Sequence, residues 1–232
     1  MVVIPSFYVA KDGADGNSGA SWALAKLTIG AAITAAASGD TIYIAAGTYN
    51  EIYTCGAKGL TFQGVGKVIL SGAGLGSGSL VTWSAGTCTL NDLQVLNAES
   101  ILVVDPSTYI GLTMNRCAVL NCAGGVGGVS AGGNGSKLTL SDCLFVGRGT
   151  GIGLDLHAYA PGGTTVTRCT VLSWATGVRM LSYITESQSN VMDSCFVGSC
   201  AVALQLPTKS SLYVSDYNAL DFTAGKCIVN SV

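Results

Sequence analysis

Three residues near the middle of the chain have side chains that could carry out acid–base chemistry. Asp155 and His157 stand two positions apart in the phrase GIGLDLH, and Arg179 follows in GVRMLSY. A carboxylate, an imidazole and a guanidinium can transfer protons and stabilise charge on a sugar substrate. Hydrolysis of a glycosidic bond uses a pair of carboxylates, however, and no second acid aligns with Asp155 in the neighbouring phrases. We therefore name Asp155, His157 and Arg179 as catalytic candidates, with a surface or interface role as the favoured alternative.

Oxygen-bearing side chains also gather in a glycine-rich segment near the N-terminus. Asp12, Asp15 and Asn17 lie within the phrase DGADGNSG. Carboxylate and amide oxygens are the ligands that calcium prefers, but the longer calcium loop with its distal glutamate is absent. These three residues are calcium candidates, and a turn without calcium is the favoured alternative. No cofactor is expected.

Four of the nine cysteines follow a regular repeat. Cys117, Cys143, Cys169 and Cys195 stand 26 residues apart, and each opens a similar phrase: NRCAVL, SDCLFV, TRCTVL and DSCFVG. A zinc site needs closely paired ligands such as CxxC, whereas the closest pairs here are CxxxxC and the chain has one histidine. The spacing therefore predicts reduced cysteines, packed as small apolar residues in a core and kept in a reducing compartment.

The repeat also predicts the architecture. Related phrases without the cysteine surround Leu93 and Tyr217, and every copy has apolar residues three places before and two places after the cysteine position. Between them lie small polar residues, which suit a tight bend between two short strands. A unit of this length cannot bury its own apolar face, so it must stack on its neighbours. The glycine-rich runs 72–78, 124–133 and 147–153 are predicted as turns between the stacked units or as close subunit contacts.

The position before each cysteine carries alternating charges. It is occupied in turn by Asp92, Arg116, Asp142, Arg168, Ser194 and Asp216. If successive units lie one β-spacing apart, about 4.8 Å, opposite charges become neighbours. We predict a ladder of ion pairs on the outside of the bend.

The composition excludes several classes of function. Charged residues make up 10% of the chain and the formal net charge is −2, so no basic surface for nucleic acid is expected. The mean hydropathy is +0.50, yet no apolar run approaches the roughly 20 residues of a membrane helix, and no secretory signal is visible. A surface so poor in charge favours burial against other subunits.

Residues 8–51 contain a recognisable opening segment. Its pattern predicts a helix over Lys26–Ala37, a turn at 38–40, a strand over Thr41–Ala46 and a second turn at 47–49. The motif residues are Tyr8-Val9, Asp12-Gly13, Asp15, Gly19, Thr28-Ile29, Ala32, Ala36, Gly39-Asp40-Thr41-Ile42, Ile44, Gly47-Thr48-Tyr49 and Glu51. With these residues the chain resembles the pectate-lyase-like right-handed parallel β-helix superfamily.

The resemblance implies an all-β fold: a single-stranded right-handed parallel β-helix, or solenoid, with a short N-terminal capping α-helix. We expect one domain over 1–232, with a leader and cap over 1–51 and stacked rungs over 52–232. The segment LTFQGVGKVILSGAG resembles the first full rung. The closing phrase DFTAGKCIVNSV is strand-like and has no helix after it, so another subunit is expected to cover that edge.

The same scaffold carries polysaccharide lyases, hydrolases, phage tailspikes and virion proteins without catalysis, so the fold alone does not select a function. We expect a structural component of a tailed-phage virion, a capsid decoration (cement) protein or short spike, rather than an enzyme. Its expected partners are two further copies of itself, in a homotrimer, and a major capsid or other virion protein, without nucleic acid or membrane. It would be assembled in the host cytoplasm and located in the virion, with Met1–Phe7 as an anchor. The alternatives are a carbohydrate-active lyase or depolymerase and a glycan-binding β-helix without catalysis.

Overall fold

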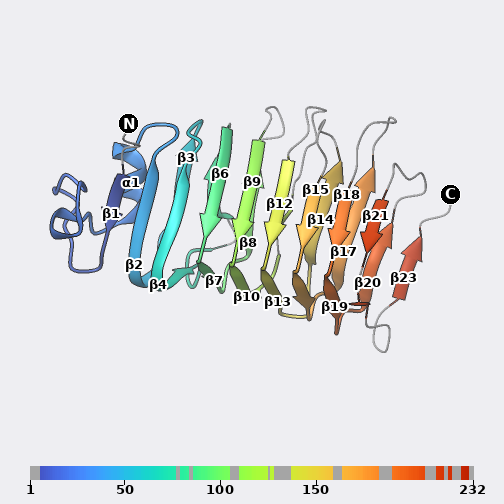
Figure 1. The fold of residues 1–232 in the computed structure, drawn as a ribbon. Helices are drawn as coiled ribbons and strands as arrows, with labels where there is room; N and C mark the ends of the chain where they lie inside the picture. Colours follow the sequence, from blue (N-terminus) through green and yellow to red (C-terminus); the bar gives the residue numbers. More distant parts are fainter. Residues whose placement is uncertain are drawn as a thin grey trace.

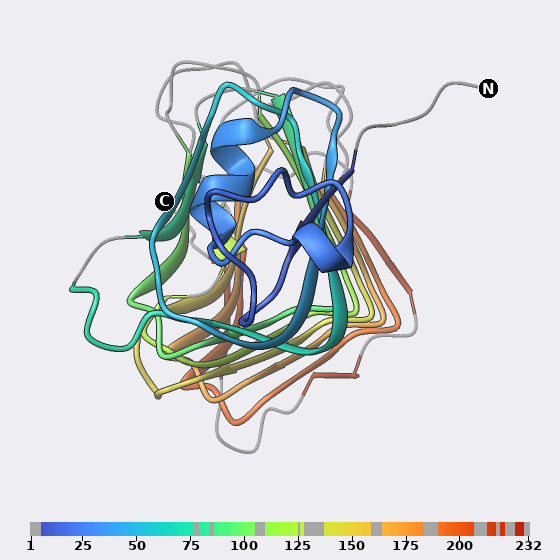
Figure 2. The same cartoon turned by 90° about the vertical axis from the view of Figure 1, so that its left-hand side faces the viewer.

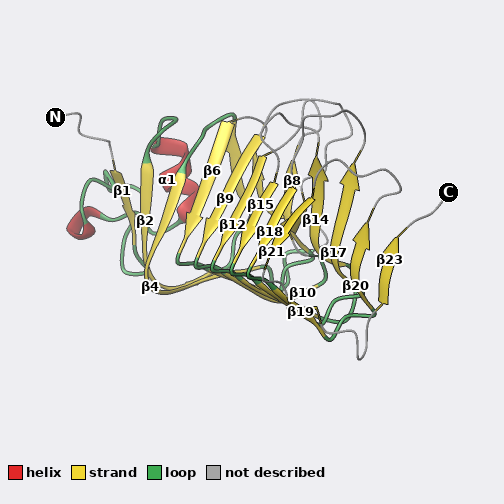
Figure 3. Cartoon of the chain, turned by 45° about the vertical axis from the view of Figure 1, so that its right-hand side comes forward, coloured by secondary structure: helices red, strands yellow, loops and turns green. Residues whose placement is uncertain are grey.

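The computed structural model describes residues 6–76, 79–83, 86–104, 110–124, 126–127, 137–158, 164–182, 190–206, 213–216, 219–220 and 226–229. Over these residues the chain winds as a right-handed coil of parallel strands, with one α-helix at its N-terminal end (Figures 1 and 3). The predicted fold class is confirmed. No helix in this part of the chain is long and apolar enough to cross a bilayer.

The coil has three walls. The first wall contains the beginnings of β2 (Thr41–Tyr49) and β4 (Thr61–Ser71), then β6 (Gly86–Asn91), β9 (Ile110–Asn115), β12 (Lys137–Ser141), β15 (Thr164–Thr167), β18 (Asn190–Asp193) and β21 (Tyr213–Asp216). The second wall contains the end of β4, then β7 (Gln94–Leu96), β10 (Ala118–Cys122), β13 (Leu144–Gly147), β16 (Thr170–Leu172), β19 (Phe196–Gly198) and β22 (Ala219–Leu220). β4 runs round the corner and joins these two walls into one sheet.

The third wall closes the coil. It contains β3 (Tyr53–Gly56), β5 (Ser79–Trp83), β8 (Ser100–Val104), β11 (Val126–Gly127), β14 (Ile152–Ala158), β17 (Thr176–Ser182), β20 (Val202–Leu206) and β23 (Lys226–Val229). In Figure 2, seen from the N-terminal end, the three walls enclose a narrow interior. Every pairing is parallel, and each strand lies beside the strand one repeat later.

Apolar residues stack inside the coil in continuous columns. In the second wall, Val119 pairs with Phe145, Phe145 with Val171 and Val171 with Val197. All four side chains are buried, at 0–1% exposure. Because the side chains of a strand alternate between its two faces, one residue in two must be apolar here. The alternation of apolar and polar residues in the sequence therefore places an apolar side chain at each inward position of this column.

The bend between the first and second walls is a single residue in the left-handed backbone region. The φ angles are 57° at Asp92, 52° at Arg116, 56° at Asp142, 50° at Arg168 and 53° at Ser194. Aspartate tolerates this region better than most residues, whereas arginine is uncommon there. The arginines are held by their neighbours, because Arg116 Nε lies 2.7 Å from Asp92 Oδ1 and Arg168 Nε lies 2.6 Å from Asp142 Oδ1. The predicted ladder is confirmed for these two pairs.

A second left-handed corner, which the sequence did not reveal, lies at or just beyond the ends of several strands of the second wall. It lies at Asn97, Asn121, Ser173 and Ser199, with φ between 53° and 59°. Asn121 Nδ2 donates a hydrogen bond to Asn97 Oδ1 on the rung before. Both corners therefore stack polar side chains outside the coil.

The cysteines are core residues, as predicted. The eight described cysteines are all buried: Cys55, Cys88, Cys117, Cys122, Cys143, Cys169, Cys195 and Cys200. Thiols of the repeat donate to backbone carbonyls of the preceding rung, from Cys117 Sγ to Leu90 O at 3.3 Å and from Cys143 Sγ to Met114 O at 3.5 Å. Burial raises the pKa of the Cys122 and Cys200 thiols, which keeps both protonated.

The helix α1 spans Ile29–Ala35, so the predicted helix over Lys26–Ala37 was too long at both ends. Lys26 instead joins the sheet, since its backbone nitrogen donates to Tyr8 O in β1 (Ser6–Val9). Thr28 is the N-cap, and its hydroxyl accepts from Ala31 N at 3.1 Å. β1 also means that the end of the proposed leader belongs to the coil, while residues 1–5 lie outside the described part.

The predicted turn at 47–49 was also wrong, because β2 continues to Tyr49. A bulge between Ala45 and Gly47 lets the strand turn the corner without ending, with φ of 155° at Gly47. Such a bulge needs the conformational freedom of glycine, so the sequence signal resembled that of a turn. Since β2 pairs with β4, the coil already begins before residue 51.

The helix α1 covers the N-terminal end of the coil (Figure 2), and side chains from the first rungs hold it there by hydrogen bonds. Glu51 accepts hydrogen bonds from Ile29 N at 3.1 Å and Gly30 N at 3.0 Å. At the other end of the helix, Lys58 Nζ donates to Ile33 O at 2.7 Å. These contacts place charges of the favourable sign at both ends of the helix.

The core columns predict a large difference between two adjacent positions. Phe145→Ala should lower the free energy of unfolding by about 3–5 kcal/mol, because it leaves a cavity between two rungs. Leu144→Ala, at a side chain that is 37% exposed, should cost less than about 1 kcal/mol. Urea denaturation of both variants measures the two values, and equal losses would contradict this assignment of faces.

The ladder predicts a pH dependence. Hydrogen bonds from Arg168 and Ser141 lower the pKa of Asp142 from 3.8 to about 2. A depressed carboxyl pKa stabilises the fold above pH 3.8, and this contribution is lost as the pH falls to about 2. Asp142→Asn should therefore show a smaller loss of urea midpoint than the wild type over this range. Arg168→Gln should reproduce the effect, and the double variant should add nothing further.

Candidate functional site

The structure brings two of the three catalytic candidates together. Asp155 in β14 lies directly beside Arg179 in β17. The guanidinium donates twice to the carboxylate, with 2.8 Å between Nε and Oδ1 and a second short bond between Nη2 and Oδ2. Asp155 lies between the inward-pointing Leu154 and Leu156, so its side chain is on the outer face of the third wall, yet it is only 8% exposed. The pair is a bidentate ion pair that joins two rungs.

This arrangement supplies one carboxylate where glycoside hydrolysis uses two. In the described register, Gly127 lies beside Asp155 on one side of the pair and Gln205 lies beside Arg179 on the other. His157 belongs to the same strand, beside Leu181, and its side chain lies outside the described part. Catalysis by the three candidates stays a hypothesis, and the observed contact is structural.

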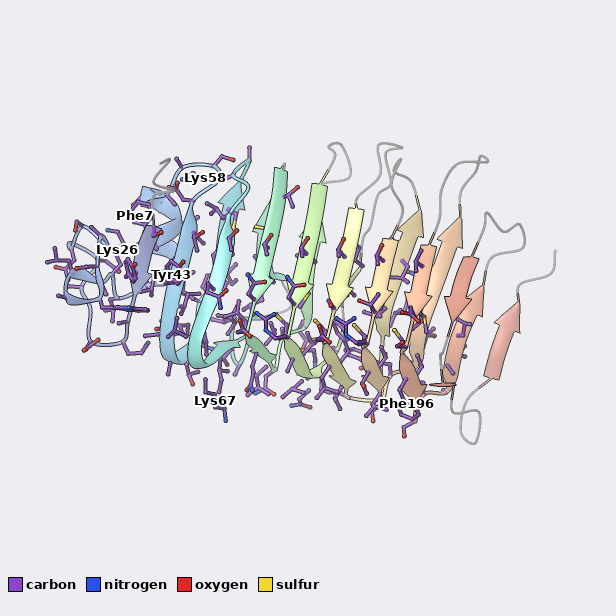
Figure 4. The ribbon with its side chains drawn as sticks, in the orientation of Figure 1. Phe7, Lys26, Tyr43, Lys58, Lys67 and Phe196 are labelled. Carbon is purple, nitrogen blue, oxygen red and sulfur yellow. The ribbon has the colours of Figure 1, made fainter. Side chains whose placement is uncertain are left out.

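In the N-terminal segment, a lysine occupies the centre of the calcium candidates. Lys26 Nζ donates to Asp15 O at 3.1 Å and to Asn17 O at 2.8 Å, and Lys26 is 8% exposed (Figure 4). The Asp15 carboxylate accepts from Thr28 N at 2.8 Å, so it holds the residue before the helix. Asn17 Nδ2 donates to Ala25 O, and Asp12 is exposed. An ammonium group thus already binds the carbonyl oxygens that a metal ion would use.

No metal centre is formed elsewhere in the ranges given above. Among these residues, no group of three or more histidine, cysteine, aspartate and glutamate side chains could hold a metal ion.

An open cavity of about 420 Å³ lies at the second corner of the coil. Its lining comprises Gly72, Ala73, Gly74, Gly76, Asn97, Glu99 and Arg148. Arg148 Nη2 lies 2.7 Å from Glu99 Oε1, although the two residues are 49 positions apart. Arg148 thus reaches across the intervening rung, and its side chain and that of Glu99 are 36% and 45% exposed.

No sequence pattern pairs the charged residues of this site. Glu99 and Arg148 occupy different positions within their repeats, so no column pairs them. The only signal was the glycine-rich run 72–78, which was predicted as a turn. That turn forms one side of the cavity, and Figure 2 shows the segment leaving the outline of the coil.

The first wall presents a polar outer face. A threonine from each strand between β2 and β15 stacks on the next, and Val191 continues the column in β18; the threonines are Thr41, Thr61, Thr89, Thr113, Thr139 and Thr165. The adjacent outward column contains Gln63, Asn91, Asn115, Ser141 and Thr167. All of these side chains are half-buried, as expected on a flat sheet in contact with water.

The outer face of the second wall is mainly apolar, and we call it the apolar strip. Its outward residues are Ile69, Gln94, Leu96, Ala118, Leu120, Leu144, Val146, Thr170, Leu172 and Phe196. None of them is charged, and Leu144 and Phe196 are 37% and 41% exposed. In Figure 4, Phe196 points away from the coil. The strip is the clearest candidate for a docking surface.

Comparisons with known proteins agree with the fold. No family model matches the chain, and no curated protein matches it. A pectin methylesterase from Aspergillus niger aligns with 100% of this chain and 91% of its own, at 14% identity and a TM-score of 0.50. A rhamnogalacturonan lyase aligns with 93% of this chain and 73% of its own, at 12% identity and a TM-score of 0.46.

A pectate lyase aligns with 95% of this chain and 78% of its own, at 12% identity and a TM-score of 0.42. At such identities the likeness concerns the fold and not the activity. The likeness to the pectin methylesterase agrees with the fold seen here, a right-handed parallel β-helix.

Proposed function

We propose that this protein is a structural docking protein without catalytic activity, and that the apolar strip is its contact with a second copy of the chain. The observation that supports this proposal is the contrast between two walls of one coil. From β4 to β15 the first wall has hydroxyl and amide side chains outside. The second wall has mainly apolar side chains at the equivalent positions, with Gln94 and Thr170 as polar members. A generally apolar composition would affect both walls alike.

The surroundings of the strip support an interface. The Asp92–Arg116 and Asp142–Arg168 pairs lie along one edge, and Asn97, Asn121 and Ser173 lie along the other. An apolar centre with a polar rim is the usual anatomy of a protein interface. Six neighbouring strands at about 4.8 Å make the strip roughly 24 Å long.

The finer part of the proposal concerns the assembly. We propose a homotrimer that serves as a capsid decoration protein or short spike of a tailed phage, docked on a major capsid or other virion protein. The low charge and the rigid, flat walls support an architectural role. Capsid, portal and terminase genes beside the gene for this chain would favour the virion, and neighbouring genes for polysaccharide uptake would contradict it.

The apolar strip predicts that charge will block self-association. Leu144→Lys combined with Phe196→Lys should convert a trimer into monomers, because lysine desolvation opposes burial of the strip. Thr113→Lys combined with Thr165→Lys is the matched control, since these residues are equally spaced on the first wall and should leave the trimer intact. Sedimentation equilibrium at micromolar concentration measures the masses. A monomeric wild type would refute the strip as a self-association surface.

A second candidate is a carbohydrate-active enzyme, a lyase or depolymerase. The observation in its favour is the Asp155–Arg179 pair on the outer face of the third wall, where a carboxylate and a guanidinium meet. If this candidate is right, ultraviolet absorbance will detect unsaturated uronates when the protein is mixed with acidic polysaccharides. Asp155→Ala should then abolish the signal, whereas Asp142→Asn should retain it. We expect no signal from the wild type.

A further inference from the structure

We infer that the cavity at the second corner binds a neutral sugar residue through two neighbouring hydroxyl groups. The cavity is the one lined by the turn 72–76 together with Asn97, Glu99 and Arg148. This inference goes beyond the docking role and does not depend on it, because the cavity and the apolar strip are different surfaces. It concerns binding alone and includes no chemical step.

The cavity is preformed, since backbone and side-chain contacts hold the turn that overhangs it. Asn50 Nδ2 donates to Ser71 O at 3.0 Å and to Ala73 O at 2.9 Å. Gly72 N donates to Leu96 O at 2.9 Å, which ties the turn to the next rung. Leu75 packs against the hydrophobic core. A ligand would therefore meet an ordered wall, which reduces the entropic cost of binding.

Hydrogen-bonding groups with remaining capacity face this cavity. Asn97 Oδ1 already accepts from Asn121, an arrangement that leaves the Asn97 amide NH₂ as a donor. Glu99 Oε1 accepts from Arg148, and among the described residues no bond is found to Glu99 Oε2. Arg148 uses only Nη2 in this pair, so it retains further N–H donors. The cavity thus offers one strong acceptor and two donors.

This pattern matches a pair of adjacent sugar hydroxyls. One hydroxyl can donate to Glu99 Oε2 and the other can accept from Arg148 or Asn97, so that each hydroxyl uses its donor and acceptor character. The charges of Glu99 and Arg148 cancel, so the site has no net attraction for an anion. An acidic sugar would bring its carboxylate close to that of Glu99, and like charges oppose binding.

The volume of the cavity and the residues that line it determine how strongly a sugar should bind. A cavity of about 420 Å³ lies within the range of small-molecule sites and is large enough for one or two sugar residues. Its lining contains no aromatic side chain, so a stacking contribution is missing and weak binding is expected. Glycines at 74 and 76, with φ of 75° and 84°, keep the wall low enough for a sugar ring to enter.

The test measures binding by saturation-transfer NMR and calorimetry. The neutral probes are cellotetraose, mannotetraose and galactotetraose, and trigalacturonate is the acidic probe. We expect at least one neutral oligosaccharide to bind in the millimolar range and trigalacturonate not to bind. Asn97→Ala and Glu99→Gln should each weaken that binding about tenfold, the effect of losing one charged or well-placed hydrogen bond. Ala73→Trp, at an exposed position in the lining, should abolish it by filling the cavity.

Asp142→Asn is the matched control for Glu99→Gln, because it removes the same charge from an exposed arginine pair at the other corner and should leave binding unchanged. Unfolding midpoints show whether each variant is folded, and Ala73→Trp preserves every hydrogen-bonding group if the corner variants are unstable. The inference is overturned if none of the neutral probes binds at millimolar concentration, if Ala73→Trp still binds them, or if only trigalacturonate binds. The monomeric Leu144→Lys/Phe196→Lys protein should bind the same sugar, which separates this result from the fate of the docking proposal.

Discussion

The structure depends on the mutual burial of successive rungs. A rung has an apolar inner face that is too small to form a core by itself, and only the rung above and the rung below can cover it. Phe145 is an example, since it is fully buried between Val119 and Val171, which come from different repeats. The first rung has no rung before it, and α1 covers that end instead, with Glu51 and Lys58 holding the helix in place.

Stacking alone does not select the register, and the corners supply that selection. A slip by one residue would turn every inward side chain outward, which is prohibitively costly for the columns. A slip by a whole rung would cost less, but it would separate Arg116 from Asp92. The exposed ion pairs add little stability individually. These pairs instead make the correct pairing of two adjacent rungs more stable than a pairing shifted by one rung.

Once the interior is satisfied, the outer faces are free to differ, and function resides there. The first wall carries threonine and amide columns, the second wall carries the apolar strip, and the third wall carries the Asp155–Arg179 pair. The rigid coil keeps each set of side chains in a regular array. A docking surface and a sugar-binding corner can therefore coexist on one short coil, because neither requires the interior to change.

The 26-residue spacing and the alternation around Cys117 were sufficient to predict the coil, the buried cysteines and the Asp–Arg ladder. These features repeat along the chain, so several copies report the same local structure, and the family resemblance supplied the N-terminal cap. The ends of α1 and the bulge at Gly47 were predicted incorrectly, because single hydrogen bonds and one backbone angle decide them. Sequence also placed Asp155 beside Arg179 by counting rungs, but it could not show that Asp155 is nearly buried.

The corner cavity was invisible in the sequence for a related reason. Glu99 and Arg148 meet only because one long side chain crosses a rung, and this contact follows no repeat. The sequence by itself thus determined the period, the inward and outward faces and the bends, since each depends on residues close together in the chain. Tertiary structure alone decided which side chains from different rungs meet outside the coil, because those contacts depend on side-chain reach and corner shape, which the repeat does not specify.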